Sequence, residues 1–179
     1  MTKLSPEHIS RIGQVADGLL LSGDHPRGKE KDLIKAFAEL YQCGHYDEEI
    51  PMTESCTIVY EQPFKYGRAD IVIYHSDGSA SVIEAKNGYT GYTHTISGIG
   101  QATMYAVQLA NLKGAVTKVR RCLLWSGTGS ISLDCVITMA CEEARVISLA
   151  MPPMDVLMAT RAASRIVVEE VLGGCKEEG

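Results

Sequence analysis

The sequence predicts an α/β fold in which helices flank a mixed β-sheet. Segments rich in Val, Ile and aromatic residues alternate with segments whose apolar residues recur at helical spacing. Two strand-like segments, 68–75 and 79–86, are joined by Ser76-Asp77-Gly78, a turn typical of a β-hairpin. The 179 residues are enough for one ordinary domain with a hydrophobic core, and we expect a single domain over residues 1–179.

Two helices are expected before the strands. Ser5 is a good N-cap and Pro6 suits the first helical position, so the first helix should run to about Leu20. A second helix is expected from about residue 29 to residue 42, after the loop 22–28. Its core-facing stripe begins with Glu30 and continues through Leu33, Ile34, Phe37, Leu40 and Tyr41.

The same patterns of apolar residues, glycine and proline predict the remaining strands and helices. A strand is expected at 54–61 and should end before Pro63 and Gly67, and the stretch 87–100, rich in Gly, Thr and Tyr, is expected to be a mobile loop. After it we expect a helix at 100–112, a strand at 119–127, a helix at 131–143, a strand at 145–151, and a closing helix from Pro152-Pro153 to about Gly173-Gly174.

Composition places the chain among soluble globular proteins. Apolar residues make up 45% and charged residues 22%, the apolar runs are too short to span a bilayer, and the first ten residues lack a signal-peptide core, so we expect a cytoplasmic protein. The net charge of −5 counts against non-specific coating of nucleic acid but leaves room for a local binding patch. The six cysteines lack zinc-site spacing and are expected to be reduced packing residues.

The hairpin turn fixes the relation between two acidic residues. A three-residue loop with Gly78 in the left-handed region pairs His75 with Ser79. Counting back along both strands places Asp70 opposite Glu84 and Arg68 opposite Lys86. A two-residue loop would instead put Asp70 and Glu84 on opposite faces of the sheet.

Opposed carboxylates need something to offset their repulsion. At a separation of ~5 Å they repel by roughly 3 kcal/mol at an effective dielectric of 20. Asp70, Glu84 and the Ala85 carbonyl would together form a hard oxygen site suited to Mg²⁺. Two simpler explanations stay open: Lys86 pairs with Glu84 at a strand edge, for ~0–1 kcal/mol, or Glu30 only complements its helix dipole, for ~0.3–1 kcal/mol.

These residues resemble the pattern of the PD-(D/E)XK nuclease superfamily. In that pattern a helix Glu precedes a hairpin that carries an Asp and then (D/E)-x-K, matched here by Glu30, Asp70 and Glu84-Ala85-Lys86, with Ala69 at the name-giving proline. Gln101 and Tyr105 resemble the Q-x-x-x-Y element of RecB-type nucleases and phage exonucleases. The stretch RGKEKDLIKAFAEL also resembles the opening of archaeal Holliday-junction resolvases, and the resemblance covers about residues 28–127, with helical extensions on both sides.

The resemblance implies a restriction-endonuclease-like core and a Mg²⁺-dependent deoxyribonuclease that acts in DNA repair, recombination, defence or phage replication. Asp70, Glu84 and the Ala85 carbonyl would hold Mg²⁺, or Mn²⁺ as a substitute, and Glu30 would complete the shell or hold a second metal. Lys86 would orient the attacking water or steady negative charge, and Gln101 and Tyr105 would contact the substrate or position Lys86. The iron–sulfur cysteine pattern of some RecB-type members is missing, so no cluster is expected.

DNA is the expected partner, and a homodimer would suit an enzyme that cuts two strands. The candidate DNA contacts are Tyr89, Tyr92 and His94 in the 87–100 segment and the basic residues Lys65 and Arg68. The alternative for the tyrosines is inward packing. Two alternatives to the enzyme stay open: an inactive module of the same fold that binds DNA or a partner protein, and a purely structural subunit.

Overall fold

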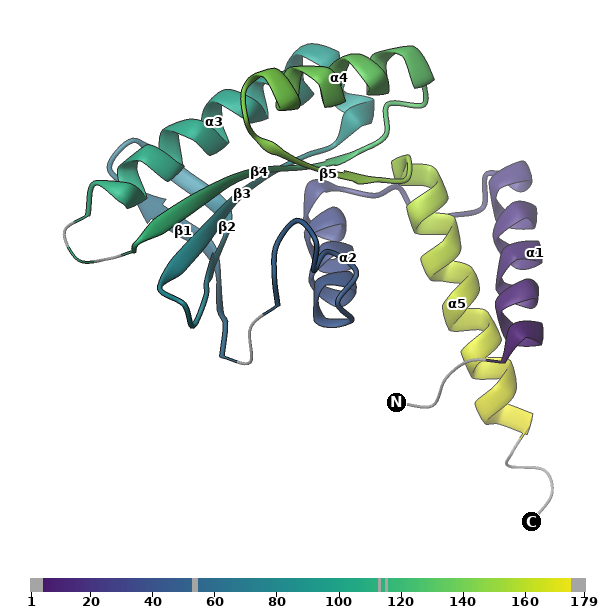
Figure 1. The fold of residues 1–179 in the computed structure, drawn as a ribbon. Coiled ribbons are helices and arrows are strands. Elements are labelled where there is room, and N and C mark those ends of the chain that lie inside the picture. The colour runs from purple at the N-terminus through teal and green to yellow at the C-terminus, as the bar shows by residue number, and fades with distance from the viewer. Residues whose placement is uncertain (1–4, 53–54, 113, 115, 175–179) are drawn as a thin grey trace. The chain divides into compact units, whose positions relative to one another are not determined.

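The computed structural model describes residues 5–52, 55–112, 114 and 116–174 (Figure 1). The chain forms two compact units. Residues 29–151 make up the larger unit, and the two terminal segments, 1–28 and 152–179, make up the smaller one.

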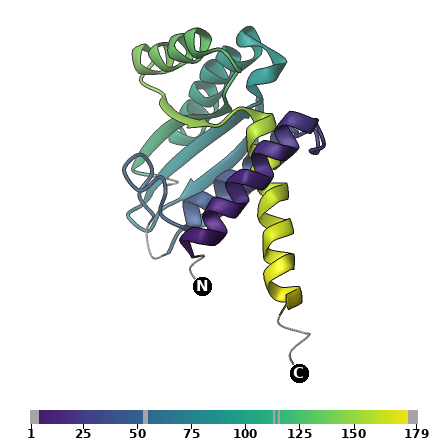
Figure 2. The ribbon, with the colours of Figure 1, turned by 90° about the vertical axis from the view of Figure 1, so that its right-hand side faces the viewer.

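The smaller unit is a pair of helices that lie side by side, α1 (Pro6–Ser22) and α5 (Met154–Gly174) (Figure 1 and Figure 2). The predicted start of α1 is confirmed, because the Ser5 hydroxyl accepts the His8 N–H at 3.3 Å and Pro6 is the first helical residue. Gly23 ends the helix with a left-handed φ of 69°.

The larger unit contains a five-stranded sheet in the order β1-β2-β3-β4-β5. Antiparallel pairing joins β1 to β2 and β2 to β3, whereas parallel pairing joins β3 to β4 and β4 to β5. The predicted α/β class with a mixed sheet is therefore confirmed. The strands are β1 (Thr57–Phe64), β2 (Gly67–Tyr74), β3 (Ser79–Lys86), β4 (Lys118–Ser126) and β5 (Ile147–Met151).

Helices cover both faces of this sheet. Figure 1 shows α3 (Tyr92–Ala110) and α4 (Ile131–Glu143) on one face and α2 (Glu30–Gln42) on the other. The helix α3 packs on β3 and β4, where Tyr105, Ala106 and Leu109 form a buried cluster with Ala80 and Val82. Because both faces are covered, every residue of β3 is buried, which makes its two charged residues, Glu84 and Lys86, unusual.

The predicted hairpin register is confirmed. The N–H of His75 donates to the Ser79 carbonyl at 2.9 Å, and Gly78 has the left-handed φ of 79° that the turn requires. Tyr74 pairs with Ala80 and Ile71 with Ile83, where the ladder ends, and the same register continued by one step places Asp70 opposite Glu84.

The prediction of a mobile loop at 87–100 is wrong. After a short 3-10 turn, η1 (Gly88–Thr90), helix α3 already begins at Tyr92, eight residues before the predicted start. Thr95 is fully buried and Gly98 is also buried, so packing on the sheet holds this segment helical despite its weak intrinsic propensity.

The first strand also differs from its prediction. Residue 54, the predicted start, lies outside the described residues, and β1 begins at Thr57. Pro63 does not end the strand but lies inside it, opposite Arg68. The strand tolerates proline because β1 is at the edge of the sheet, where N–H groups on one side have no strand to pair with. Among the described residues, every helix is too short or too polar to cross a bilayer.

Candidate active site

The ladder between β2 and β3 opens at Asp70. The regular register would continue by pairing Ala85 with Ala69, but the Ala85 N–H instead donates to Oδ2 of Asp70 at 2.7 Å. The Asp70 carboxylate therefore lies between the ends of the two strands. Burial raises its pKa, and Glu30 and Glu61 raise it further, while the Ala85 N–H and Lys86 oppose the shift.

Glu84 and Lys86 form a buried ion pair on the same face of β3. Lys86 Nζ donates to Glu84 Oε1 at 2.7 Å, and Lys86 and Glu84 are only 6% and 4% exposed. The other carboxylate oxygen, Glu84 Oε2, is buried without a hydrogen-bond partner in the described structure. Burial raises the pKa of Glu84 to about 7, and the nearby Asp70 and Glu30 add to the shift while Lys86 opposes it.

Helix α3 packs against the face of the sheet that carries the Lys86 side chain. A Cβ at Gly98 would lie 2.9 Å from Cγ of Lys86, so only glycine lets the helix approach the lysine stem this closely. Gln101 follows about one turn later, and its Oε1 is buried without a hydrogen-bond partner in the described structure. Helix α3 thus brings Gln101 to the face of the sheet that carries Glu84 and Lys86.

Tyr105 is a packing residue of this helix. Its ring is 5.7 Å from that of Phe64 in a stacked arrangement, and a Cβ at Gly67 would lie 2.6 Å from its hydroxyl. It is 5% exposed and belongs to the cluster of Ala80 and Val82 described above. Its position two turns beyond Gly98 therefore fixes α3 against the start of β2.

Glu30 reaches the site from the first residue of α2. Its Oε1 lies 2.9 Å from Nε2 of His94 and accepts the N–H of Asn87 at 3.4 Å. Asn87 directly follows β3, so Glu30 lies at the end of the strand that carries Glu84 and Lys86. His94 is one of the DNA contacts expected from the sequence, and in the structure it lies beside Glu30 of α2.

A small network that the sequence did not reveal holds the segment after Lys86. The buried Ser126 hydroxyl at the end of β4 accepts the Gly88 N–H at 3.0 Å and donates to Oδ1 of Asn87 at 3.3 Å. A Cβ at Gly88 would come within 2.1 Å of the Ser126 carbonyl oxygen, so this contact requires glycine. The network positions the N–H of Asn87 that Glu30 accepts.

The sequence also gives no indication of the role of Glu61. The pairing of β1 with β2 is regular at Tyr60 and at Gln62 but skips Glu61, which has a left-handed φ of 55°. Such a backbone is strained for a non-glycine residue and is often found near functional sites. Its side chain forms an ion pair with Arg68, so Arg68 turns toward β1 rather than toward Lys86. The alternation of apolar residues along β1 gives no sign of this irregularity.

The remaining predicted DNA contacts are dispersed. Lys65 lies at the β1–β2 turn with Nζ 4.9 Å from the centre of the Tyr66 ring. Tyr89 is half exposed, whereas Tyr92 packs against the buried cluster of Leu123 and Trp125. Glu30, Asp70, Glu84, Lys86 and His94 thus lie around the end of β3. Tyr92 packs beside them on Leu123 and Trp125, the β4 residues paired with Glu84 and Lys86. Gln101 lies about one turn of α3 beyond Gly98, and Lys65 lies apart at the β1–β2 turn.

The donor set is chemically suited to a divalent cation. Asp70 and Glu84 supply carboxylate oxygens, and a cation or water could bind Glu84 Oε2, which has no hydrogen-bond partner among the described residues. Within the described ranges there is no group of three or more His, Cys, Asp or Glu side chains arranged to hold a metal ion. Glu30 contacts His94 and Asn87 in this arrangement.

No protein-family model matches the sequence, and no curated protein matches it either. Among solved structures, the chain is similar to a repair endonuclease from Pyrococcus abyssi, with 17% identity, a TM-score of 0.37, and coverage of 64% of this chain and 47% of that one. It is also similar to Pyrococcus furiosus SfsA in complex with Ca²⁺, with 15% identity, a TM-score of 0.37, and coverage of 67% and 56%.

A third similar structure is an EndoMS complex with double-stranded DNA, with 16% identity, a TM-score of 0.36, and coverage of 64% of this chain and 44% of that one. The chain therefore spans about half the length of these three proteins.

Proposed function

We propose that this protein is a metal-dependent DNA nuclease that hydrolyses phosphodiester bonds at the end of β3. The observation that carries the proposal is the opening of the β2–β3 ladder at Asp70, directly opposite the buried pair of Glu84 and Lys86. Burying Lys86 and Glu84 beside the partly buried carboxylate of Asp70 is costly unless the charges serve a purpose beyond folding.

Asp70, Glu84 and the Ala85 carbonyl would hold Mg²⁺, with Mn²⁺ as a substitute and with Glu30 completing the shell. The cation would neutralise charge on the phosphate and lower the pKa of a bound water. The N–H of Ala85 orients the Asp70 carboxylate, and the backbone network of Asn87 and Ser126 orients Glu30. The contact with Ala85 holds Asp70 before substrate arrives, whereas Glu30 would have to turn from His94 to join the cation.

Lys86 would act on the attacking water or on the negative charge that develops at the phosphate. The ammonium group of Lys86 donates to Glu84, and the aliphatic part of its side chain packs against Gly98. These two contacts define the position of the ammonium group. A fixed cation in a water-poor site stabilises developing charge more strongly than it would in bulk water. Gln101 would contribute a further polar group beside Lys86, while Tyr105 would position α3.

The experiment that tests this proposal is cleavage of labelled linear, circular and branched DNA in Mg²⁺ or Mn²⁺, with and without EDTA. We expect cleavage by the wild type that EDTA abolishes and that Asp70→Asn loses. Tight DNA binding without turnover under either metal would contradict the enzyme and favour the inactive binding module instead.

A further inference from the structure

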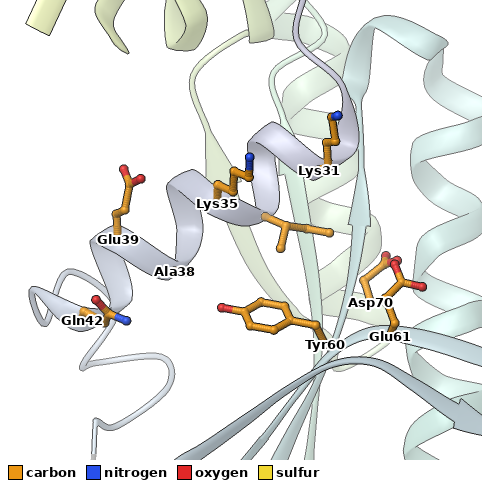
Figure 3. Close-up of a pocket in the computed structure, with 9 residues that line it drawn as sticks. Lys31, Lys35, Ala38, Glu39, Gln42, Tyr60, Glu61 and Asp70 are labelled. Carbon is orange, nitrogen blue, oxygen red and sulfur yellow. The ribbon is translucent and has the colours of Figure 1, made fainter. Parts of the chain in front are cut away.

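A pocket of about 490 Å³ borders Asp70 between helix α2 and the edge strand β1. This volume lies in the range of small-molecule sites, ~300–1,000 Å³. Figure 3 shows Lys31 and Lys35 on α2, with Tyr60 and Glu61 on β1 and Asp70 nearby on β2. The pocket therefore leads directly to a residue of the candidate active site.

The α2 wall of this pocket is basic near the active site. Lys31 and Lys35 are four residues apart, so they lie on one face of α2, and both are exposed. Neither is among the ion pairs found within the described part of the chain. Two such lysines on one helix face can contact successive phosphates of a single strand.

The β1 wall of the pocket carries an aromatic ring. Tyr60 is 49% exposed although it lies within a strand, and it faces the open space of the pocket in Figure 3. An exposed ring beside basic side chains is the arrangement that binds single-stranded nucleic acid, because every base can stack on it. A base paired within a duplex has no free face to offer this ring.

Acidic residues also border the pocket, but their negative charges do not line the whole length of the pocket. Glu61 is ion-paired with Arg68, and Asp70 belongs to the proposed cation site. Glu39 lies two turns beyond Lys31, at the end of α2 that is farther from Asp70 (Figure 3). The basic part of the wall is thus the part nearest Asp70.

We propose that this pocket receives an unpaired nucleotide of the DNA strand next to the scissile phosphate, with its base on Tyr60 and its backbone phosphates on Lys31 and Lys35. This inference rests on the proposed nuclease function and adds a substrate class to it. The favoured substrate is then single-stranded DNA, or duplex DNA whose strand is unpaired at the point of cleavage.

The test measures binding of fluorescent DNA to the full-length protein in EDTA, so that the result does not depend on turnover. Two ligands are compared: a single-stranded oligonucleotide and a blunt duplex of the same sequence. We expect Tyr60→Leu to weaken single-strand binding by roughly 10-fold, within the range expected for loss of base stacking, and to leave duplex binding unchanged. Tyr60→Phe keeps the ring and should bind as the wild type does.

The lysines supply a second and independent readout. Replacing either Lys31 or Lys35 with Gln should reduce the slope of log Kd against log salt by about 0.7 for the single strand, the value expected for one phosphate contact. Lys118→Gln, at an exposed position at the start of β4, should leave the slope unchanged. Tyr66→Leu, at an exposed aromatic residue outside the pocket, is the control for Tyr60.

The proposal is overturned if Tyr60→Leu binds the single strand as tightly as the wild type, or if it weakens duplex binding by the same factor. It is also overturned if neither lysine variant changes the salt slope. The nuclease proposal fails on a different result. It is contradicted if the wild type shows no metal-dependent cleavage, whatever these binding experiments show.

Discussion

Lys86 donates to Glu84 over 2.7 Å, and both side chains are almost completely buried two residues apart on one strand. A buried ion pair is a weak source of stability, because the desolvation of the two charges offsets much of their attraction. Breaking such a pair by removing one partner is nevertheless costly. The pair therefore links the stability of the sheet to the chemistry proposed for Lys86, and substitutions can separate the two.

Lys86→Met should reduce the rate of DNA cleavage by about 100- to 1,000-fold, the typical effect of removing one group that stabilises developing charge. It should also lower the free energy of unfolding at pH 8 by up to ~3–5 kcal/mol, because Glu84 is left buried without its cation. Urea denaturation and single-turnover cleavage measure the two effects.

The double variant Lys86→Met/Glu84→Gln distinguishes the catalytic role from the structural one. It removes both charges, so we expect much of the lost stability to return while cleavage stays at least about 100-fold slower than in the wild type. Recovery of cleavage together with stability would show that Lys86 only supports the fold.

The unfolding free energy of the metal-free protein should depend on the ionisation of Glu84. Its pKa rises from an ordinary value of 4.5 to about 7 in the folded protein, so between these values the folded state binds more protons than the unfolded chain. Stability contributed by this group therefore falls as pH rises through that window, by up to about 3 kcal/mol. Urea titrations in EDTA at intervals from pH 4.5 to pH 8 measure it.

The control for this prediction is Glu84→Gln, which cannot ionise. The buried His75 has a lowered pKa, so its contribution to stability changes with pH in the opposite direction. Because His75 is present in both proteins, the difference between the two profiles isolates Glu84. Parallel profiles for the wild type and Glu84→Gln would contradict the raised pKa.

Gly98→Ala should destabilise the fold by roughly 1–3 kcal/mol, the usual cost of overpacking a buried site. Its Cβ would lie 2.5 Å from Cδ1 of Leu123 and 2.9 Å from Cγ of Lys86, so α3 or the lysine must shift. Gly100→Ala is the matched control, since it lies in the same helix with nothing within 4 Å of its Cβ. The control should be neutral or stabilising by up to ~1 kcal/mol, and equal thermal shifts for the two variants would contradict the close approach.

Mg²⁺ should stabilise the folded protein by binding at Asp70 and Glu84. At a concentration 100 times the Kd, the expected gain is about 2.7 kcal/mol. Thermal unfolding at pH 8 should show a higher Tm in Mg²⁺ than in EDTA for the wild type and for Glu143→Gln, an exposed acid at the end of α4. The same rise in Asp70→Asn would place the metal elsewhere.

Local turn chemistry predicts the part of the site that lies on the hairpin. A three-residue turn with Gly78 in the left-handed region has one natural register, and the strands adopt that register, with Asp70 opposite Glu84. The helical phase likewise places Glu30 rather than Glu39 toward the core side, and Glu30 does reach the end of β3. These predictions succeed because they depend on residues close in sequence.

The rest of the site depends on contacts that sequence spacing does not encode. Helix α3 begins at Tyr92 because Thr95 and Gly98 pack on the sheet, so a Gly- and Thr-rich segment adopts a helix it would not form alone. The contact of His94 with Glu30 spans 64 residues, and that of Ser126 with Gly88 spans 38. Such long-range pairs become visible only once the sheet and its helices are assembled.

Single-turnover cleavage of one labelled DNA in Mg²⁺ is the most direct test of the proposed roles of Glu84 and Lys86. The wild type is compared with Glu84→Gln and with Lys86→Met/Glu84→Gln. Circular dichroism would first verify that all three proteins are folded. We expect the wild type to cleave and EDTA to stop it, whereas both variants should show at least a roughly 100-fold loss of rate. Cleavage by either variant at the wild-type rate would contradict the assignment of Glu84 and Lys86 to the chemistry.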